Sequence, residues 1–166
     1  RKRNIPYKIY GGQSFYQRKE IKDLLAYFRL SVNQNDEEAL KRVINYPRRG
    51  IGDTTIDKIR DLALQHRVSM WTVLCNLNKI SGVINASTAA KLNNFRLLIE
   101  RFATQVSTEN AYDLAVTIAQ SSGIVDDLSN DSTPEGISRK ENIQELLNAI
   151  KDFSETNYKE GRDDKL

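Results

Sequence analysis

The segment between two amphipathic stretches of this chain reads Asn45-Tyr46-Pro47-Arg48-Arg49-Gly50-Ile51-Gly52-Asp53-Thr54-Thr55. Its two glycines flank one isoleucine, and glycine permits positive φ and the close approach of another backbone. A helical pattern resumes directly after this turn, and the first N–H groups of a helix have no partner inside it. Because such N–H groups attract phosphate, and because Arg48, Arg49 and Lys58 are nearby in sequence, the segment predicts a site that holds a nucleic-acid backbone without reading bases.

An alternative interpretation of the same segment is a tight connection between two helices, because glycine is common in turns. The two arginines before the turn and the Asp/Thr-rich start of the next helix favour phosphate binding. Both interpretations place residues 45–55 between helices. They differ in whether the outer face of the turn meets a ligand.

Apolar residues on both sides of this turn recur at the spacing of amphipathic helices. The stripes comprise Ile21, Leu24, Leu25 and Phe28, then Ala39, Leu40, Val43 and Ile44, then Ile56, Ile59 and Leu62, with further stripes in residues 69–75, 87–102, 110–121 and 134–153. Helix starts are predicted at Asp36, at Asp53 or Thr54, at Ser69, at Ser87 or Thr88, at Asn110 and at Thr133-Pro134. The chain is therefore predicted to be all-α, a multi-helix bundle of about seven or eight helices with a helix-hairpin-helix-like Gly-Ile-Gly turn.

One short strand is predicted at Tyr7–Tyr10, where β-prone residues lie between Pro6 and Gly11-Gly12. No convincing second strand is found, and one strand cannot make a sheet. We therefore expect the partners of this orphan strand in another part of a longer protein, from which this chain is a segment.

Charge is distributed unevenly along the chain. Residues 1–101 carry 19 basic and 9 acidic side chains, whereas residues 102–166 carry 6 basic and 13 acidic side chains. Such asymmetry indicates that the basic half meets a polyanion. The alternative for any single charge is a solvated surface.

Chemistry that needs clustered cysteine or histidine is excluded by composition. The chain has one cysteine, Cys75, and one histidine, His66, which cannot build a zinc site of the usual kind. Cys75 lies in an apolar stretch and is predicted to be buried. No stretch approaches the roughly 18 apolar residues that a membrane span needs, so a reducing, cytoplasmic setting without a membrane partner is predicted.

Nucleotide-binding and catalytic motifs are also absent from the sequence. There is no Gly-x-x-x-x-Gly-Lys-Ser/Thr loop, and Gly50-x-Gly52-x-x-Thr55 lacks the third glycine of a dinucleotide fingerprint. No arrangement of nucleophile, base and orienting group is found. We therefore predict no catalytic residue, no cofactor-binding residue and no metal site within this chain.

Three runs of sequence resemble motifs of the UvrD/PcrA/Rep helicases of superfamily 1. The first is Tyr7–Leu30 (YKIYGGQSFYQRKEIKDLLAYFRL), the second is Arg42–Gly52 (RVINYPRRGIG) and the third, weaker one is Ser138–Ile143 (SRKENI). The resemblance implies that residues 1–30 are the end of the first segment of subdomain 2A, a RecA-like motor domain. It implies that residues 31–166 belong to the helical insertion called subdomain 2B.

The resemblance also implies an activity for the parent protein, namely ATP-dependent 3′–5′ DNA unwinding with ATP and Mg²⁺. The motifs that hold ATP lie outside this chain, so the fragment alone is expected to be inactive. Its implied role is to bind duplex DNA and to regulate unwinding. The alternative is a protein-interaction domain that docks repair factors or other subdomains of the helicase, which the acidic half of the chain favours.

The resemblance finally implies which residues contact DNA. Backbone phosphate contacts are implied at Gly50, Ile51 and Gly52, with side-chain contacts from Arg49, Thr54, Thr55 and Lys58, and with less support from Arg48. The implied partner is double-stranded DNA at a single-strand/duplex junction, in addition to other subdomains of the same helicase and repair proteins. Because phosphate contacts carry no sequence information, binding is expected to tolerate any sequence.

Overall fold

A computed structural model describes residues 12–80 and 82–159 of the chain, with only the backbone described for residues 12, 13 and 157–159. Within these ranges the chain forms nine α-helices, one short 3₁₀-helix and no strand, which confirms the predicted all-α class. The elements are α1 (Gly12–Tyr16), α2 (Lys19–Val32), α3 (Glu37–Val43), α4 (Asp53–His66), α5 (Met70–Cys75), η2 (Leu77–Lys79), α6 (Ala86–Gln105), α7 (Ala111–Ser121), α8 (Ile124–Ser129) and α9 (Pro134–Lys159).

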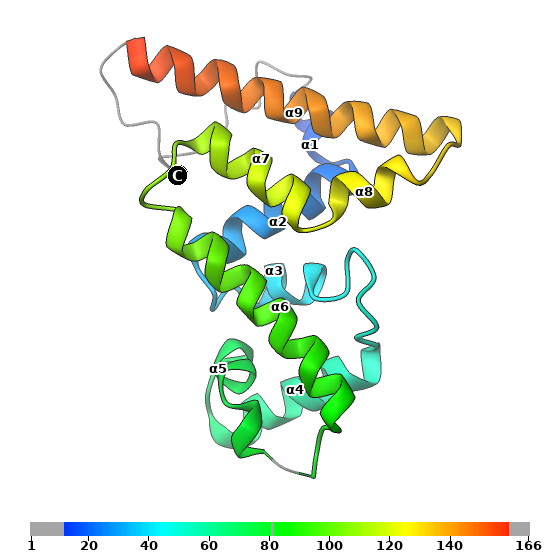
Figure 1. Cartoon of the computed structure of the whole chain (residues 1–166), viewed down its shortest axis with the longest axis vertical. Helices are drawn as coiled ribbons and strands as arrows, with labels where there is room; N and C mark the ends of the chain where they lie inside the picture. Colours follow the sequence, from blue (N-terminus) through cyan, green and yellow to red (C-terminus); the bar gives the residue numbers. More distant parts are fainter. Residues whose placement is uncertain (1–11, 81, 160–166) are drawn as a thin grey trace.

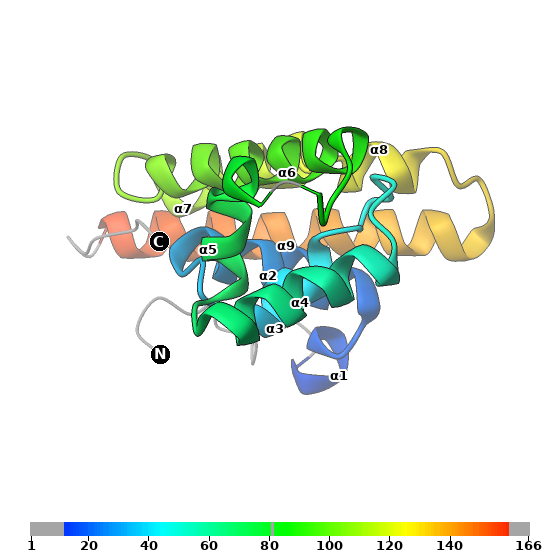
Figure 2. The same cartoon turned by 90° about the horizontal axis from the view of Figure 1, so that it is seen from below.

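Helix α2 is the centre of the bundle. It packs against α3, α6, α7 and α9, and Figure 2 shows α6 and α7 on one side of it and α3 and α4 on the other. Its residues Ile21, Leu24 and Tyr27 are completely buried. Ile21, Leu24 and Phe28 of the predicted stripe are buried, whereas Leu25 is only partly buried and packs against the core.

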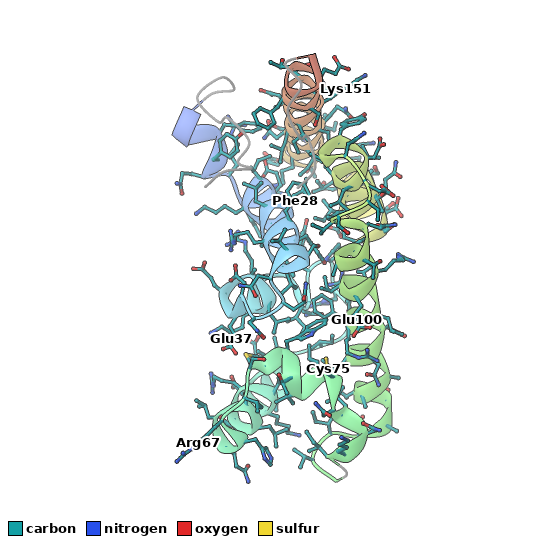
Figure 3. All side chains as sticks on the ribbon, turned by 90° about the vertical axis from the view of Figure 1, so that its left-hand side faces the viewer. Phe28, Glu37, Arg67, Cys75, Glu100 and Lys151 are labelled. Atoms are coloured by element: carbon teal, nitrogen blue, oxygen red, sulfur yellow. The ribbon has the colours of Figure 1, made fainter. Side chains whose placement is uncertain are left out.

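The long helix α6 connects the two ends of the molecule. In Figure 1 it runs from α7, beside the long helix α9, down to the part formed by α4 and α5. Figure 3 shows the same separation, with Lys151 of α9 at one end and Arg67, just after α4, at the other. Phe95, Ile99 and Phe102 of α6 are fully buried, so this helix carries one continuous core along its length.

Several helix starts follow the predicted capping chemistry. The side chains of Asp36, Ser69 and Asn110 accept backbone N–H groups at the starts of α3, α5 and α7. Thr133 does the same for α9, where Pro134 is the first helical residue. These caps satisfy N–H groups that the helix itself leaves unpaired.

One predicted start and one predicted cap were wrong. Helix α6 begins earlier than expected, because Asn85, rather than Ser87 or Thr88, accepts the N–H of Thr88. Helix α4 is preceded by Gly52, which has no side chain to cap it, rather than by a capping Asp53 or Thr54. At both helices the predicted and the observed residues differ by a few positions, which is the usual uncertainty of helix boundaries.

Other expectations also differ from the structure. The short helices α1, of 5 residues, and α8, of 6 residues, were not predicted, and α8 lacks a capping side chain such as Ser69 provides for the equally short α5. Cys75, predicted to be buried, is exposed at the end of α5. The strand predicted at Tyr7–Tyr10 lies outside the described residues. No helix in the ranges that the structure describes is long and apolar enough to cross a membrane.

A buried polar pair joins α2 to α9 and gives a first prediction. The Nδ2 of Asn142 donates a hydrogen bond of 2.7 Å to Oε2 of Glu20, and both residues are buried. We expect Asn142→Ala to lower the free energy of unfolding by about 2 kcal/mol, because a buried carboxylate loses its donor. Urea denaturation followed by circular dichroism measures this. Asn148→Ala, exposed on the same helix, is the control, and equal midpoints for the two variants would contradict the prediction.

Candidate nucleic-acid interface

The loop between α3 and α4 is held from its inner side by one asparagine. Asn45 Oδ1 accepts the backbone N–H of Arg49 at 2.8 Å and that of Ile51 at 3.1 Å. The Ile51 side chain is completely buried. The loop also contains a cis peptide bond between Tyr46 and Pro47. The middle of the loop is thus fixed to the core and is not a free turn.

The guanidinium of Arg49 lies inside this loop and binds backbone carbonyls. Its Nη1 donates to the carbonyl oxygens of Val43 at 2.8 Å and Tyr46 at 3.1 Å. Its Nη2 donates to the carbonyl oxygen of Ser122, which follows α7, at 3.2 Å, and to the hydroxyl of Tyr27. One side chain therefore ties the loop to the ends of two helices, where carbonyl groups lack partners within the helix.

Tyr27 is the hydroxyl partner in this cluster. Its hydroxyl accepts from Arg49 and donates to the carbonyl of Tyr46. Burial raises the pKa of Tyr27 to about 12, and the charge of Arg49 partly opposes that rise. The phenol is therefore neutral near neutral pH, which leaves it a proton to donate.

The outer face of the loop is open. Gly50 is exposed with φ of 81°, the left-handed region that favours glycine. Gly52 is also exposed, its φ of −85° suits any residue, and a Cβ built on it would meet no atom within 4 Å. Nothing in the described protein therefore requires glycine at position 52. A ligand that approached this backbone closely would require it.

The start of α4 presents unpaired donors beside these glycines. In the part of the chain that the structure describes, no acceptor is found for the N–H groups of Asp53, Thr54 and Thr55. Thr54 is exposed and Thr55 is partly exposed. The positive end of the helix dipole adds to the attraction that these groups exert on an anion.

Cations and one carboxylate surround this helix start. Arg48 and Lys58 are exposed, and neither forms an ion pair with another described residue. Arg60 is instead paired with Asp57 at 3.2 Å. Asp53 is an exposed carboxylate on the first residue of α4, and it opposes an incoming phosphate.

The structure separates the residues predicted to contact DNA into an exposed group and a group whose polar atoms have partners inside the protein. Gly50, Gly52, Thr54, Thr55 and Lys58 lie on or beside the open face. The Arg49 guanidinium and the Ile51 N–H already have partners inside the protein. The structure also adds Asn45, which sequence reasoning missed. A local signal for this role exists in the sequence, because asparagine side chains commonly accept backbone N–H groups in turns.

Other polar features give no competing site. A pocket of about 290 Å³ is lined by Lys19, Glu20, Tyr46, Asp127, Leu128, Asp131 and Arg139, none of them a residue predicted to bind DNA. Its charges are of both signs, and Asp131 lies 3.9 Å from Arg139. Among the residues described here, no group of His, Cys, Asp or Glu could hold a metal ion.

Comparison with known proteins gives consistent matches over nearly the whole chain. Residues 1–166 match the model of the UvrD-like helicase C-terminal domain. A protein named DNA helicase II from Rickettsia typhi is 38% identical over 151 residues, which cover 91% of this chain and 23% of that protein. The ATP-dependent DNA helicase PcrA of Staphylococcus aureus is 37% identical over 154 residues, covering 93% of this chain and 21% of that protein. The chain thus spans less than a quarter of these relatives.

Proposed function

This chain belongs to the UvrD-like helicase C-terminal domain family, and we propose that it binds duplex DNA and regulates unwinding as part of an ATP-dependent 3′–5′ DNA helicase. The proposed partner is double-stranded DNA at a single-strand/duplex junction. The parent protein would supply ATP binding and Mg²⁺ from outside this chain. The names of its relatives, DNA helicase II and ATP-dependent DNA helicase PcrA, support that activity.

The single observation that carries the DNA-binding proposal is the open start of α4. Three N–H groups, at positions 53–55, have no described acceptor. Gly52 directly before them leaves empty space where any other residue would have a side chain. A phosphate group fits both features, because it accepts several hydrogen bonds and needs close approach to the backbone.

The proposed contacts follow from which groups are available. We assign phosphate contacts to the backbone at Gly50, Gly52 and Thr54 and to the side chains of Thr55 and Lys58. We propose exposed Arg48, in place of Arg49, as the arginine that contacts phosphate. Arg49 and Ile51 instead support the loop, because their polar groups are already bound within the protein.

The division into subdomains is part of the same proposal. Residues 1–30 would end the first segment of subdomain 2A, and residues 31–166 would form subdomain 2B. Helix α2 crosses this boundary and packs in the same core as α3, α6, α7 and α9. A change in orientation between the subdomains would then have to occur before α2, not within it.

The protein-interaction alternative is favoured by one observation. Exposed carboxylates gather on α8 and α9, at Asp126, Asp127, Glu135, Glu141 and Glu145. Such a surface would repel DNA and attract a basic partner. The two functions are compatible, because the acidic surface and the start of α4 lie on different helices (Figure 1).

A single substitution on α4 tests DNA binding. We expect Lys58→Ala to weaken binding of a duplex of about 20 base pairs roughly threefold to tenfold near 50 mM salt, and to reduce the slope of log affinity against log salt by about 0.9, because one phosphate contact is lost. Fluorescence anisotropy of labelled duplex measures both quantities.

The matched control for this test is Lys140→Ala. Lys140 is also an exposed lysine, but it lies on α9 among the acidic residues. It should leave affinity and slope unchanged. Equal losses in the two variants would mean that net charge, and not the start of α4, governs binding, and would count against the proposal.

A further inference from the structure

Helix α6 places an ammonium group over the Gly-Ile-Gly loop. A Cβ built on Gly50 would lie 2.9 Å from Nζ of Lys91 and 3.4 Å from its Cδ and Cε. The end of the lysine side chain therefore crosses the face of the glycine, where any other residue would obstruct it. Figure 1 and Figure 2 both show the loop passing close to the N-terminal part of α6.

The core fixes the part of α6 that carries Lys91. Phe95 lies one turn later on the same face of α6 and is completely buried. The guanidinium carbon of Arg49 lies 5.1 Å from the centre of its ring. The contact between Arg49 and Phe95 holds the loop against α6 and so brings Gly50 to Lys91.

Lys91 has no counter-charge within the described protein. It is exposed, and no ion pair or hydrogen bond of its ammonium is found among the residues that the structure describes. The only acid in α6, Glu100, lies nine residues later on the opposite side of the helix and is bound to Arg96 at 2.9 Å. A cation beside the unpaired N–H groups of α4 increases the positive potential of that surface, which an anion would neutralise.

We propose that Lys91 is a phosphate ligand of the duplex-binding surface, contributed by α6. This inference rests on the proposed function and extends the site from one helix to two. A phosphodiester group at the loop would meet the ammonium of Lys91 from α6 and the N–H groups and Lys58 from α4. Because an ammonium is a point charge, the contact strengthens binding without choosing a base sequence.

The test compares Lys91→Gln, Lys58→Gln and the double variant in the 1–166 chain, with labelled duplex DNA in a salt titration. Each single variant should bind about threefold to tenfold more weakly near 50 mM salt and lose about 0.9 from the salt slope, and the double variant should lose about twice that slope. Lys91→Arg should keep the wild-type slope. Arg101→Gln, an exposed site further along α6, is the control.

The outcomes separate this inference from the proposed function. If Lys58→Gln weakens binding and Lys91→Gln does not, the inference fails and the proposed function stands. If neither variant changes binding, or if the wild-type chain binds no duplex, both fail. If Lys91→Arg loses as much affinity as Lys91→Gln, the effect is one of shape and not of charge, and the inference is overturned. Thermal unfolding of each variant checks that the fold is kept.

Discussion

Replacing Arg49 with leucine is expected to lower the free energy of unfolding by about 3 kcal/mol. The guanidinium donates to carbonyl groups at the ends of two helices and to the Tyr27 hydroxyl. Leucine fills part of the same space but leaves those acceptors without donors, and each buried unsatisfied group costs about 1–3 kcal/mol. We set the total below the simple sum because Arg49 is only partly buried, so water reaches some of these oxygens. Urea denaturation followed by circular dichroism measures the change.

The neighbouring arginine is the matched control for this prediction. Arg48 is exposed and has no ion pair among the described residues, so Arg48→Leu should change stability by less than about 0.5 kcal/mol. The stability of Arg49→Lys should lie between those of the wild-type chain and Arg49→Leu, or close to that of Arg49→Leu, because a single ammonium cannot reproduce the fork of donors. Stabilities of Arg48→Leu and Arg49→Leu within error of each other would refute the structural role of Arg49.

This pair of arginines shows where sequence reasoning reached its limit. Arg48 and Arg49 are adjacent, chemically identical and equally placed before the Gly-Ile-Gly turn. One contact that distinguishes Arg49 is with the carbonyl of Ser122, which directly follows α7 and lies far away along the chain. No local pattern contains that contact, so the sequence could propose a basic cluster but could not say which guanidinium faces inward.

The features that the sequence did predict are local ones. The caps at Asp36, Ser69 and Asn110 depend on residues within one helical turn, and each was found. The stripe in α2 depends only on helical spacing, and three of its four residues, Ile21, Leu24 and Phe28, are buried. The approach of Lys91 to Gly50 is the opposite case, because it depends on how α6 packs against the loop. Local order was predictable, whereas the composition of the site depended on tertiary packing.

The inner and outer faces of the loop depend on each other. Asn45, Arg49 and Ile51 fix the loop by hydrogen bonds and burial, and the loop in turn sets where α4 begins. A site that holds phosphate needs its donors fixed before the ligand arrives, since ordering them later costs affinity. We therefore expect substitutions of the inner residues to reduce DNA binding indirectly, through a less ordered start of α4.

A change at Thr54 is expected to move stability and DNA binding in opposite directions. Thr54 is the second residue of α4 and is exposed. In Thr54→Glu a carboxylate near the positive end of the helix should stabilise the protein by about 0.3–1 kcal/mol. The same charge should repel phosphate and compete for the free N–H groups, so that duplex affinity near 50 mM salt falls at least tenfold, a loss of about 1.4 kcal/mol. Denaturation and fluorescence anisotropy measure the two effects.

Two companion variants make this prediction specific. Thr54→Gln has the same shape without the charge, so it should lose much less affinity than Thr54→Glu. Asp53→Asn removes the carboxylate already present at the first position of α4, and it should raise affinity about threefold because one repulsion disappears. A protein that binds duplex through another surface would show neither trend. Unchanged affinity in both Thr54→Glu and Asp53→Asn would therefore remove the start of α4 from the interface, whatever their effects on stability.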